Sequence, residues 1–118
     1  GKLELQQSWF RVPNVMRTVL NQVISAASEK ELTVDAELAD ERLRDMKFLG
    51  DEVRIQQILA NFCWNSVKFT SQGGLRIEVE AEPGSRPGFM RLFWKVIDTG
   101  KGMTQQTQES LFERFAMG

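Results

Sequence analysis

The sequence predicts an α/β fold, a two-layer α/β sandwich in which helices pack on one face of a mixed sheet. Two long stretches carry apolar residues at helical spacing, and several short stretches alternate apolar with polar residues. Glycine- and proline-rich turns separate these stretches. The length of 118 residues fits one domain, so we expect a single unit over residues 1–118.

Three helices are expected. Pro13 lies where a helix tolerates its missing N–H, and the helical pattern from Val12 runs to about residue 30. Its apolar face is predicted from Met16, Leu20, Val23, Ile24 and Ala27. Asp51 is a good N-cap for a second helix over residues 52–69, and residues 105–115 have the spacing of a third. The apolar face of the second helix is predicted from Ile55, Leu59, Phe62, Ser66 and Phe69.

The remaining ordered segments are predicted to be strands. The segment over residues 90–98 places Asp98 on the same side as its apolar residues, so the carboxylate should point toward the helices. Breaker residues at 83–88 predict a hairpin loop before it. The expected strands cover residues 3–9, 32–38, 46–49, 75–80 and 90–98.

Charge and composition limit the classes of function. The 16 acidic and 15 basic residues nearly balance, which argues against nucleic-acid or direct membrane contact driven by charge. The N-terminus lacks the pattern of a signal peptide, and the single cysteine, Cys63, is expected to be a buried reduced thiol. These features predict a cytoplasmic location. The sequence has no histidine, so neither histidine acid–base chemistry nor a phospho-accepting histidine exists within these residues.

A first polar group lies on the predicted second helix. Asn61, Asn65 and Lys68 stand at i, i+4 and i+7, which places them on one helical face. Amide oxygens suit magnesium, and an ammonium one turn further offsets phosphate charge. The same spacing also fits an ordinary solvated face of an amphipathic helix.

A second polar group ends the strand at residue 98. Asp98 is followed by Gly100, Lys101, Gly102 and Met103. A partly buried carboxylate requires donors, which the exocyclic amine of adenine can supply, and the glycines permit close approach of a flat base. A strand that simply ends in a turn capped by Asp98 is the alternative.

Taken together and in order, these segments resemble the catalytic and ATP-binding domain of sensor histidine kinases, in the GHKL superfamily with its Bergerat fold. Residues 98–103 resemble the first glycine box of that family, and residues 111–115 (Leu-Phe-Glu-Arg-Phe) resemble its F-box. The N-box resemblance is carried by Asp51, Arg54, Gln57, Ile58, Leu59, Asn61, Asn65, Ser66, Val67, Lys68, Phe69 and Thr70.

The resemblance implies an ATP and Mg²⁺ site. It implies that Asn65 coordinates magnesium, that Asn61 lines the same side, and that Lys68 reaches phosphate or ribose oxygens. Asp98 would accept the adenine amine, with no catalytic residue in these 118 residues. The other residues implied at the nucleotide are Phe69, Gly100, Gly102, Met103 and Phe115, with Phe112 beside Phe115 at the base of a lid.

Asn61 separates branches of the superfamily. The ATP-hydrolysing relatives carry a glutamate that activates water at this position, whereas an amide does not take a proton near neutral pH. The sequence therefore favours presentation of the γ-phosphate of Mg-ATP to a histidine on a separate dimerisation domain. The implied partners are that phosphoacceptor domain of the same kinase and a response-regulator receiver domain, in the cytoplasm or in the cytoplasmic portion of a membrane-bound sensor.

The family pattern continues past Gly118 with a lid, a second glycine-rich box and closing strands. We therefore expect these residues alone to be inactive and to bind nucleotide weakly. We also expect the strand over residues 90–98 to be an exposed edge that self-associates. A degenerate kinase-like domain that acts as a protein-interaction module without using ATP is the alternative function.

Overall fold

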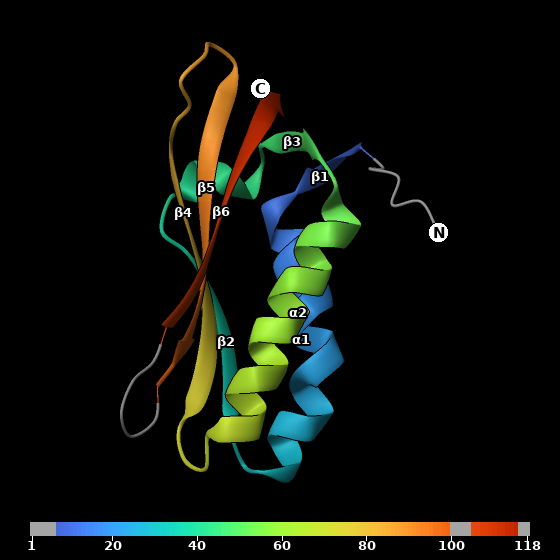
Figure 1. The fold of residues 1–118 in the computed structure, drawn as a ribbon, viewed down its shortest axis with the longest axis vertical. Helices are drawn as coiled ribbons and strands as arrows, with labels where there is room; N and C mark the ends of the chain where they lie inside the picture. The colour runs from blue at the N-terminus through green and yellow to red at the C-terminus, as the bar shows by residue number, and fades with distance from the viewer. Residues whose placement is uncertain (1–6, 100–104, 116–118) are drawn as a thin grey trace.

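The structure is a computed structural model that describes residues 7–99 and 105–115, with two long helices packed on one face of a twisted sheet (Figure 1). This arrangement confirms the predicted two-layer α/β sandwich. Along the chain the elements are β1 (Ser8–Arg11), α1 (Val12–Glu29), β2 (Thr33–Leu38), the 3₁₀-helix η1 (Glu41–Arg44), β3 (Lys47–Gly50), α2 (Glu52–Phe69), β4 (Gly74–Pro83), β5 (Phe89–Asp98) and β6 (Gln105–Phe115).

The six strands form one mixed sheet in the order β1-β3-β6-β5-β4-β2. The pair β2–β4 is parallel, and the other neighbouring pairs are antiparallel. The predicted hairpin joins β4 to β5, where the Gly84 N–H donates to the Phe89 carbonyl oxygen at 2.8 Å. Strands β1 and β2 form the two edges of the sheet, so β5 lies in its interior.

The core lies between the helices and the sheet. From α1 it receives four fully buried valines, and from β5 it receives Leu92 and Trp94, both 0% exposed. Alternation along β5 and helical spacing along α1 account for these positions. Two side chains expected on apolar faces are exposed instead, Ile24 at 46% and Phe69 at 75%. The valines are Val12, Val15, Val19 and Val23.

At both ends of α2, side chains form hydrogen bonds with backbone groups that lack a partner within the helix. At its start, the Asp51 carboxylate accepts a hydrogen bond from the Arg54 backbone N–H at 3.1 Å, which confirms the predicted N-cap. At its end, the Lys30 ammonium donates to the carbonyl oxygens of Val67 and Lys68, the second at 3.3 Å. A cation at a helix C-terminus stabilises the carbonyls that lack helical partners.

The prediction of a third helix over residues 105–115 is wrong, because this segment is the strand β6. It lies between β5 and β3 and pairs with both, whereas a helix here would leave their facing backbone groups without a strand. Phe112 is buried at 7% exposure, and its ring meets that of Phe10 edge-on at 5.2 Å and that of Phe48 at 6.4 Å. Long-range pairing thus overrides the local helical spacing.

The same strand overturns the expectation of an exposed edge over residues 90–98. β5 pairs with β4 on one side and with β6 on the other, so self-association through β5 has no free edge to use. The strand expected over residues 3–9 is observed only from Ser8, and residues 1–6 lie outside the described part. In that described part, no helix is long and apolar enough to cross a membrane.

Candidate functional site

Helix α2 carries the predicted amides and ammonium on its solvent side. Asn61 and Lys68 are exposed, and Asn65 is half-buried. The opposite side of the helix packs into the core through Leu59 and Cys63, both fully buried. The amphipathic pattern of α2 therefore turns the polar residues outward and fixes their spacing along one rigid element.

Asn65 and Lys68 line a groove between α1 and α2 with a volume of ≈ 420 Å³. Trp64, at 45% exposure, lines it from α2, and Lys30 lines it from the position just after α1. Asp98 is not one of its lining residues in the described part of the chain. The structure therefore brings Asn65 and Lys68 to one groove and leaves Asp98 outside it.

Phe69 follows Lys68 at the end of α2. Its ring is 75% exposed, and the Lys68 Nζ lies 5.4 Å from the ring centroid, within the range of a cation–π contact. Phe69 thus has the exposure that contact with a ligand requires.

Asp98 is the last residue of β5. It is half-buried and lies opposite Leu75 of β4, and the next residue, Thr99, donates its N–H to the Gly74 carbonyl oxygen at 2.8 Å. The pKa of the Cys63 thiol on α2 is raised to about 12. Burial is the larger cause, and the negative charge of Asp98 is the smaller one. Asp98 is therefore close enough to act electrostatically on α2.

Gln106 is a residue of the site region that sequence reasoning missed. Its Nε2 donates to the Phe62 carbonyl oxygen at 3.3 Å, which ties β6 to α2 one residue from Asn61. No sequence signal identified it, because the contact exists only when residues 105–115 form a strand.

Several predicted site residues are described only in part. Gly100, Gly102 and Met103 lie outside the described residues. For Phe115 the structure gives the backbone, which pairs with Lys47 of β3. Its F-box neighbour Phe112 packs in the core and not at a surface lid.

Comparison with known families agrees with this arrangement. Residues 50–118, more than half of the chain, match the family described as histidine kinase-, DNA gyrase B-, and HSP90-like ATPase. The chain belongs to this family. Members are ATP-binding domains, and the match begins just before α2 and includes every residue predicted to contact nucleotide.

Relatives of this ATPase-family domain include plant and bacterial sensor proteins. Phytochrome 1 of Physcomitrium patens is 30% identical over an alignment of 119 residues, which covers 97% of this chain and 10% of that protein. The autoinducer 2 sensor kinase/phosphatase LuxQ of Vibrio cholerae is 31% identical over 117 residues, covering 98% of this chain and 13% of LuxQ. The chain thus spans a small part of the length of these relatives.

Solved structures share the fold. Full-length ShkA in complex with AMPPNP superposes with a TM-score of 0.66 at 30% identity, over 85% of this chain and 20% of that chain. The histidine kinase ThkA in complex with the response regulator TrrA gives a TM-score of 0.54 at 20% identity, over 78% of this chain and 26% of that chain. The domain therefore has the fold of histidine-kinase catalytic domains.

Proposed function

We propose that this domain binds Mg-ATP and presents its γ-phosphate for transfer to a histidine on a separate dimerisation domain. The observation that carries the proposal is the match of residues 50–118 to an ATPase family, a span that contains Asn61, Asn65 and Lys68 on α2 and Asp98 at the end of β5. One end of such an arrangement suits a purine amine, and the other suits metal-bound phosphate.

The residues on α2 fit a magnesium–phosphate group. Asn65 offers a half-buried amide oxygen, a hard neutral ligand of the kind that magnesium accepts beside phosphate oxygens. Lys68 is exposed and free to reach a phosphate or ribose oxygen, and Asn61 lies one turn before Asn65. When bound, magnesium would neutralise phosphate charge and align the phosphoryl group.

The residues at the end of β5 fit the base. Asp98 would accept a hydrogen bond from the exocyclic amine of adenine, and Gly100 and Gly102 would let the backbone approach the ring. The exposed ring of Phe69 would pack against the nucleotide. Met103 and Phe115 complete the set that the family resemblance assigns to this pocket.

Transfer is favoured over hydrolysis by Asn61. An amide cannot remove a proton from water near neutral pH, so α2 offers no general base at this position. The chain contains no histidine, so another segment or another chain must supply the phosphoryl acceptor. The proposed partners are that phosphoacceptor domain and, downstream, the receiver domain of a response regulator.

Nucleotide titration tests the proposal. Trp64 is exposed beside Asn65, so its fluorescence should change when ATP is added with Mg²⁺. We expect Asp98→Asn to weaken ATP binding by about tenfold or more, since it removes a charged acceptor. We expect Asn65→Ala to abolish the dependence of binding on Mg²⁺ while leaving weaker metal-free binding.

Matched variants make the test specific. Asn21→Ala removes an exposed amide from α1, and Asp45→Asn removes an exposed carboxylate from the loop before β3, so neither should alter binding. Mg-dependent binding that survives both Asp98→Asn and Asn65→Ala would contradict the proposal.

A second candidate function is protein interaction without use of ATP. It is favoured by one observation, that the groove lined by Asn65 and Lys68 does not include Asp98 among the described residues. The domain would then keep the fold for contacts with other proteins. Absence of any ATP effect on the fluorescence of the wild-type domain, including a form extended past Gly118, would support this candidate.

A further inference from the structure

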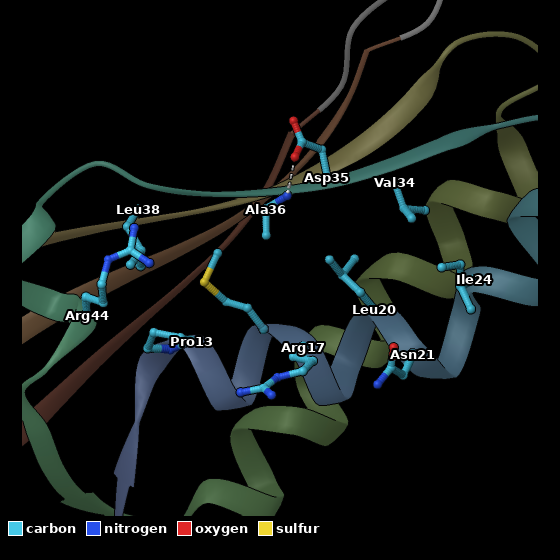
Figure 2. A pocket seen from close by; sticks show the side chains of 11 residues that line it. Pro13, Arg17, Leu20, Asn21, Ile24, Val34, Asp35, Ala36, Leu38 and Arg44 are labelled. Atoms are coloured by element: carbon cyan, nitrogen blue, oxygen red, sulfur yellow. Dashed lines mark hydrogen bonds between the residues drawn. The ribbon is translucent and has the colours of Figure 1, made fainter.

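A second groove lies between α1 and β2, on elements that carry none of the predicted nucleotide residues. Its volume is ≈ 500 Å³, and Figure 2 shows its side chains converging from the helix and from the strand. Met16 and Leu20 of α1 and Val34 and Leu38 of β2 line it, so its floor is apolar. Because β2 is the last strand of the sheet, this groove opens along a sheet edge.

The backbone of β2 is arranged for pairing on that side. The N–H groups of Thr33 and Ala39 donate inward, to the carbonyl oxygens of Gly73 at 3.0 Å and Val79 at 3.1 Å. Strand geometry repeats every two residues, so the N–H groups at positions 34, 36 and 38 point away from β4, toward the open edge of the sheet. These are the positions whose side chains line the groove.

One of the three N–H groups that point toward the open edge already donates a hydrogen bond to a neighbouring side chain. The Ala36 N–H donates to the Asp35 carboxylate at 2.8 Å, as the dashed line in Figure 2 marks. Edge strands that would otherwise recruit another chain are commonly protected by charged residues. A carbonyl oxygen from an added strand would replace the Asp35 carboxylate without leaving Ala36 unsatisfied.

The face of β2 on the side of the sheet opposite the groove, called its outer face here, is acidic. Asp35 and Glu37 alternate there, and together with Glu78 they surround one guanidinium, that of Arg76, at 3.8, 3.6 and 3.2 Å. Three carboxylates around one cation leave net negative charge on this face. Basic side chains on the facing positions of an added strand would therefore be favoured.

The groove side of the edge is mainly apolar. Arg17 and Arg44 also line it, and Arg44 is paired with Glu41 at 3.2 Å. An added strand would therefore place apolar side chains in the groove and basic ones on the outer face. The two faces together favour a partner strand in which apolar and basic residues alternate.

We propose that the β2 edge binds an extended segment of a partner protein in which apolar residues alternate with lysine or arginine. The segment would add a seventh strand to the sheet, with main-chain hydrogen bonds to β2 and apolar side chains against α1. A second copy of this chain fits less well, because antiparallel pairing of two β2 strands about Ala36 would set Asp35 opposite Glu37. The proposal does not depend on nucleotide binding.

The test uses a capped peptide of 6 residues, the length of β2, in which valine alternates with lysine. We expect saturable binding that slows hydrogen exchange of the Val34, Ala36 and Leu38 amides about tenfold or more. The Thr33 amide already pairs with β4 and should change little. A peptide with glutamate in place of lysine, and one with valines and lysines in separate blocks, should bind more weakly.

Variants of the domain separate the groove from the rest of its surface. Ile24→Arg places a charge in the groove and should weaken binding about tenfold. Val53→Arg is its matched control, because Val53 is an exposed apolar residue on α2, at 54% exposure. Glu37→Lys should remove most of the preference for the lysine peptide, because it cancels the net negative charge of this face, whereas Glu82→Lys on β4 should leave the preference in place.

Three outcomes would overturn the proposal. The first is absence of saturable binding by the alternating peptide. The second is binding that slows none of the amides at positions 34, 36 and 38. The third is slowed exchange of these amides that rises with protein concentration in the absence of peptide, which would assign the edge to a second copy.

Discussion

Asp98 at the end of β5 acts on Cys63 in the middle of α2. The Cys63 side chain is fully buried, and this burial, with the charge of Asp98 added, raises the pKa of its thiol to about 12. The two residues belong to different layers of the sandwich, so their interaction links the end of β5 to the buried side of α2. A raised thiol pKa also makes the stability of the domain depend on pH.

We predict that the domain loses stability in alkaline solution through Cys63. Below pH 9.0, the ordinary thiol pKa, the thiol is protonated in both the folded and the unfolded chain, and its contribution is fully present. Above that pH the unfolded chain ionises first, so the free energy of unfolding falls as the pH rises toward about 12. The loss approaches on the order of 4 kcal/mol at the upper end of this range.

Urea unfolding of the wild type and of Cys63→Ala at several pH values measures this effect. The alanine variant lacks the thiol, so the difference between the two proteins should shrink as the pH rises above 9.0. The chain has no tyrosine, which leaves lysines as the other main groups that titrate there, and these are common to both proteins. Asp98→Asn should reduce the wild-type slope, and Asp45→Asn should leave it unchanged.

We next predict that Phe112 is a core residue worth several kcal/mol. Its ring packs on Phe10 and Phe48 between the sheet and the start of α1, so Phe112→Ala should lower the free energy of unfolding by about 3–5 kcal/mol. Gln108→Ala, on the same strand, should cost less than about 1 kcal/mol. Equal and small losses for the two variants would contradict the assignment of residues 105–115 to a strand.

Gly50 should be coupled to Phe112. A Cβ at Gly50 would overlap the Phe112 ring, so we predict that Gly50→Ala costs about 1–3 kcal/mol in the wild type. In the Phe112→Ala background the ring is gone, and the same substitution should cost much less. A double-mutant cycle by urea unfolding gives this coupling energy, and a value near zero would place the ring elsewhere.

The contrast between α2 and β6 shows what sequence alone can predict here. The sequence predicts α2 and its N-cap because an Asp at the start and apolar residues at helical spacing are local signals. The position of Asn61, Asn65 and Lys68 on one side of the helix follows from the same spacing. β6 was mispredicted because its Leu-Phe-Glu-Arg-Phe run also has helical spacing. Only the distant strands β3 and β5, which require a partner between them, decide its structure.

The candidate site likewise has features that local sequence signals predict and features that depend on long-range strand pairing. Alternation along β5, a property of one strand, predicts the buried positions 90, 92, 94 and 96 and puts Asp98 on the same side of the strand. The Gln106–Phe62 hydrogen bond could not be predicted, because it joins residues 44 positions apart and needs the register of β6. Helical spacing predicts Phe69 on the apolar face of α2, yet it is exposed as the last residue of the helix.

We finally predict that Lys30 holds the C-terminal turn of α2 in place. Its ammonium donates to the Val67 and Lys68 carbonyl oxygens, and Lys30→Met would keep the aliphatic stem while removing both hydrogen bonds. The expected loss is about 1 kcal/mol of unfolding free energy, with faster amide exchange at Phe69 and Thr70. Lys47→Met is the matched control on β3 and should leave that exchange unchanged. Because Lys68 and Phe69 belong to this turn, a frayed turn in Lys30→Met should also weaken Mg-ATP binding, whereas unchanged exchange at both amides would show that the turn holds without Lys30.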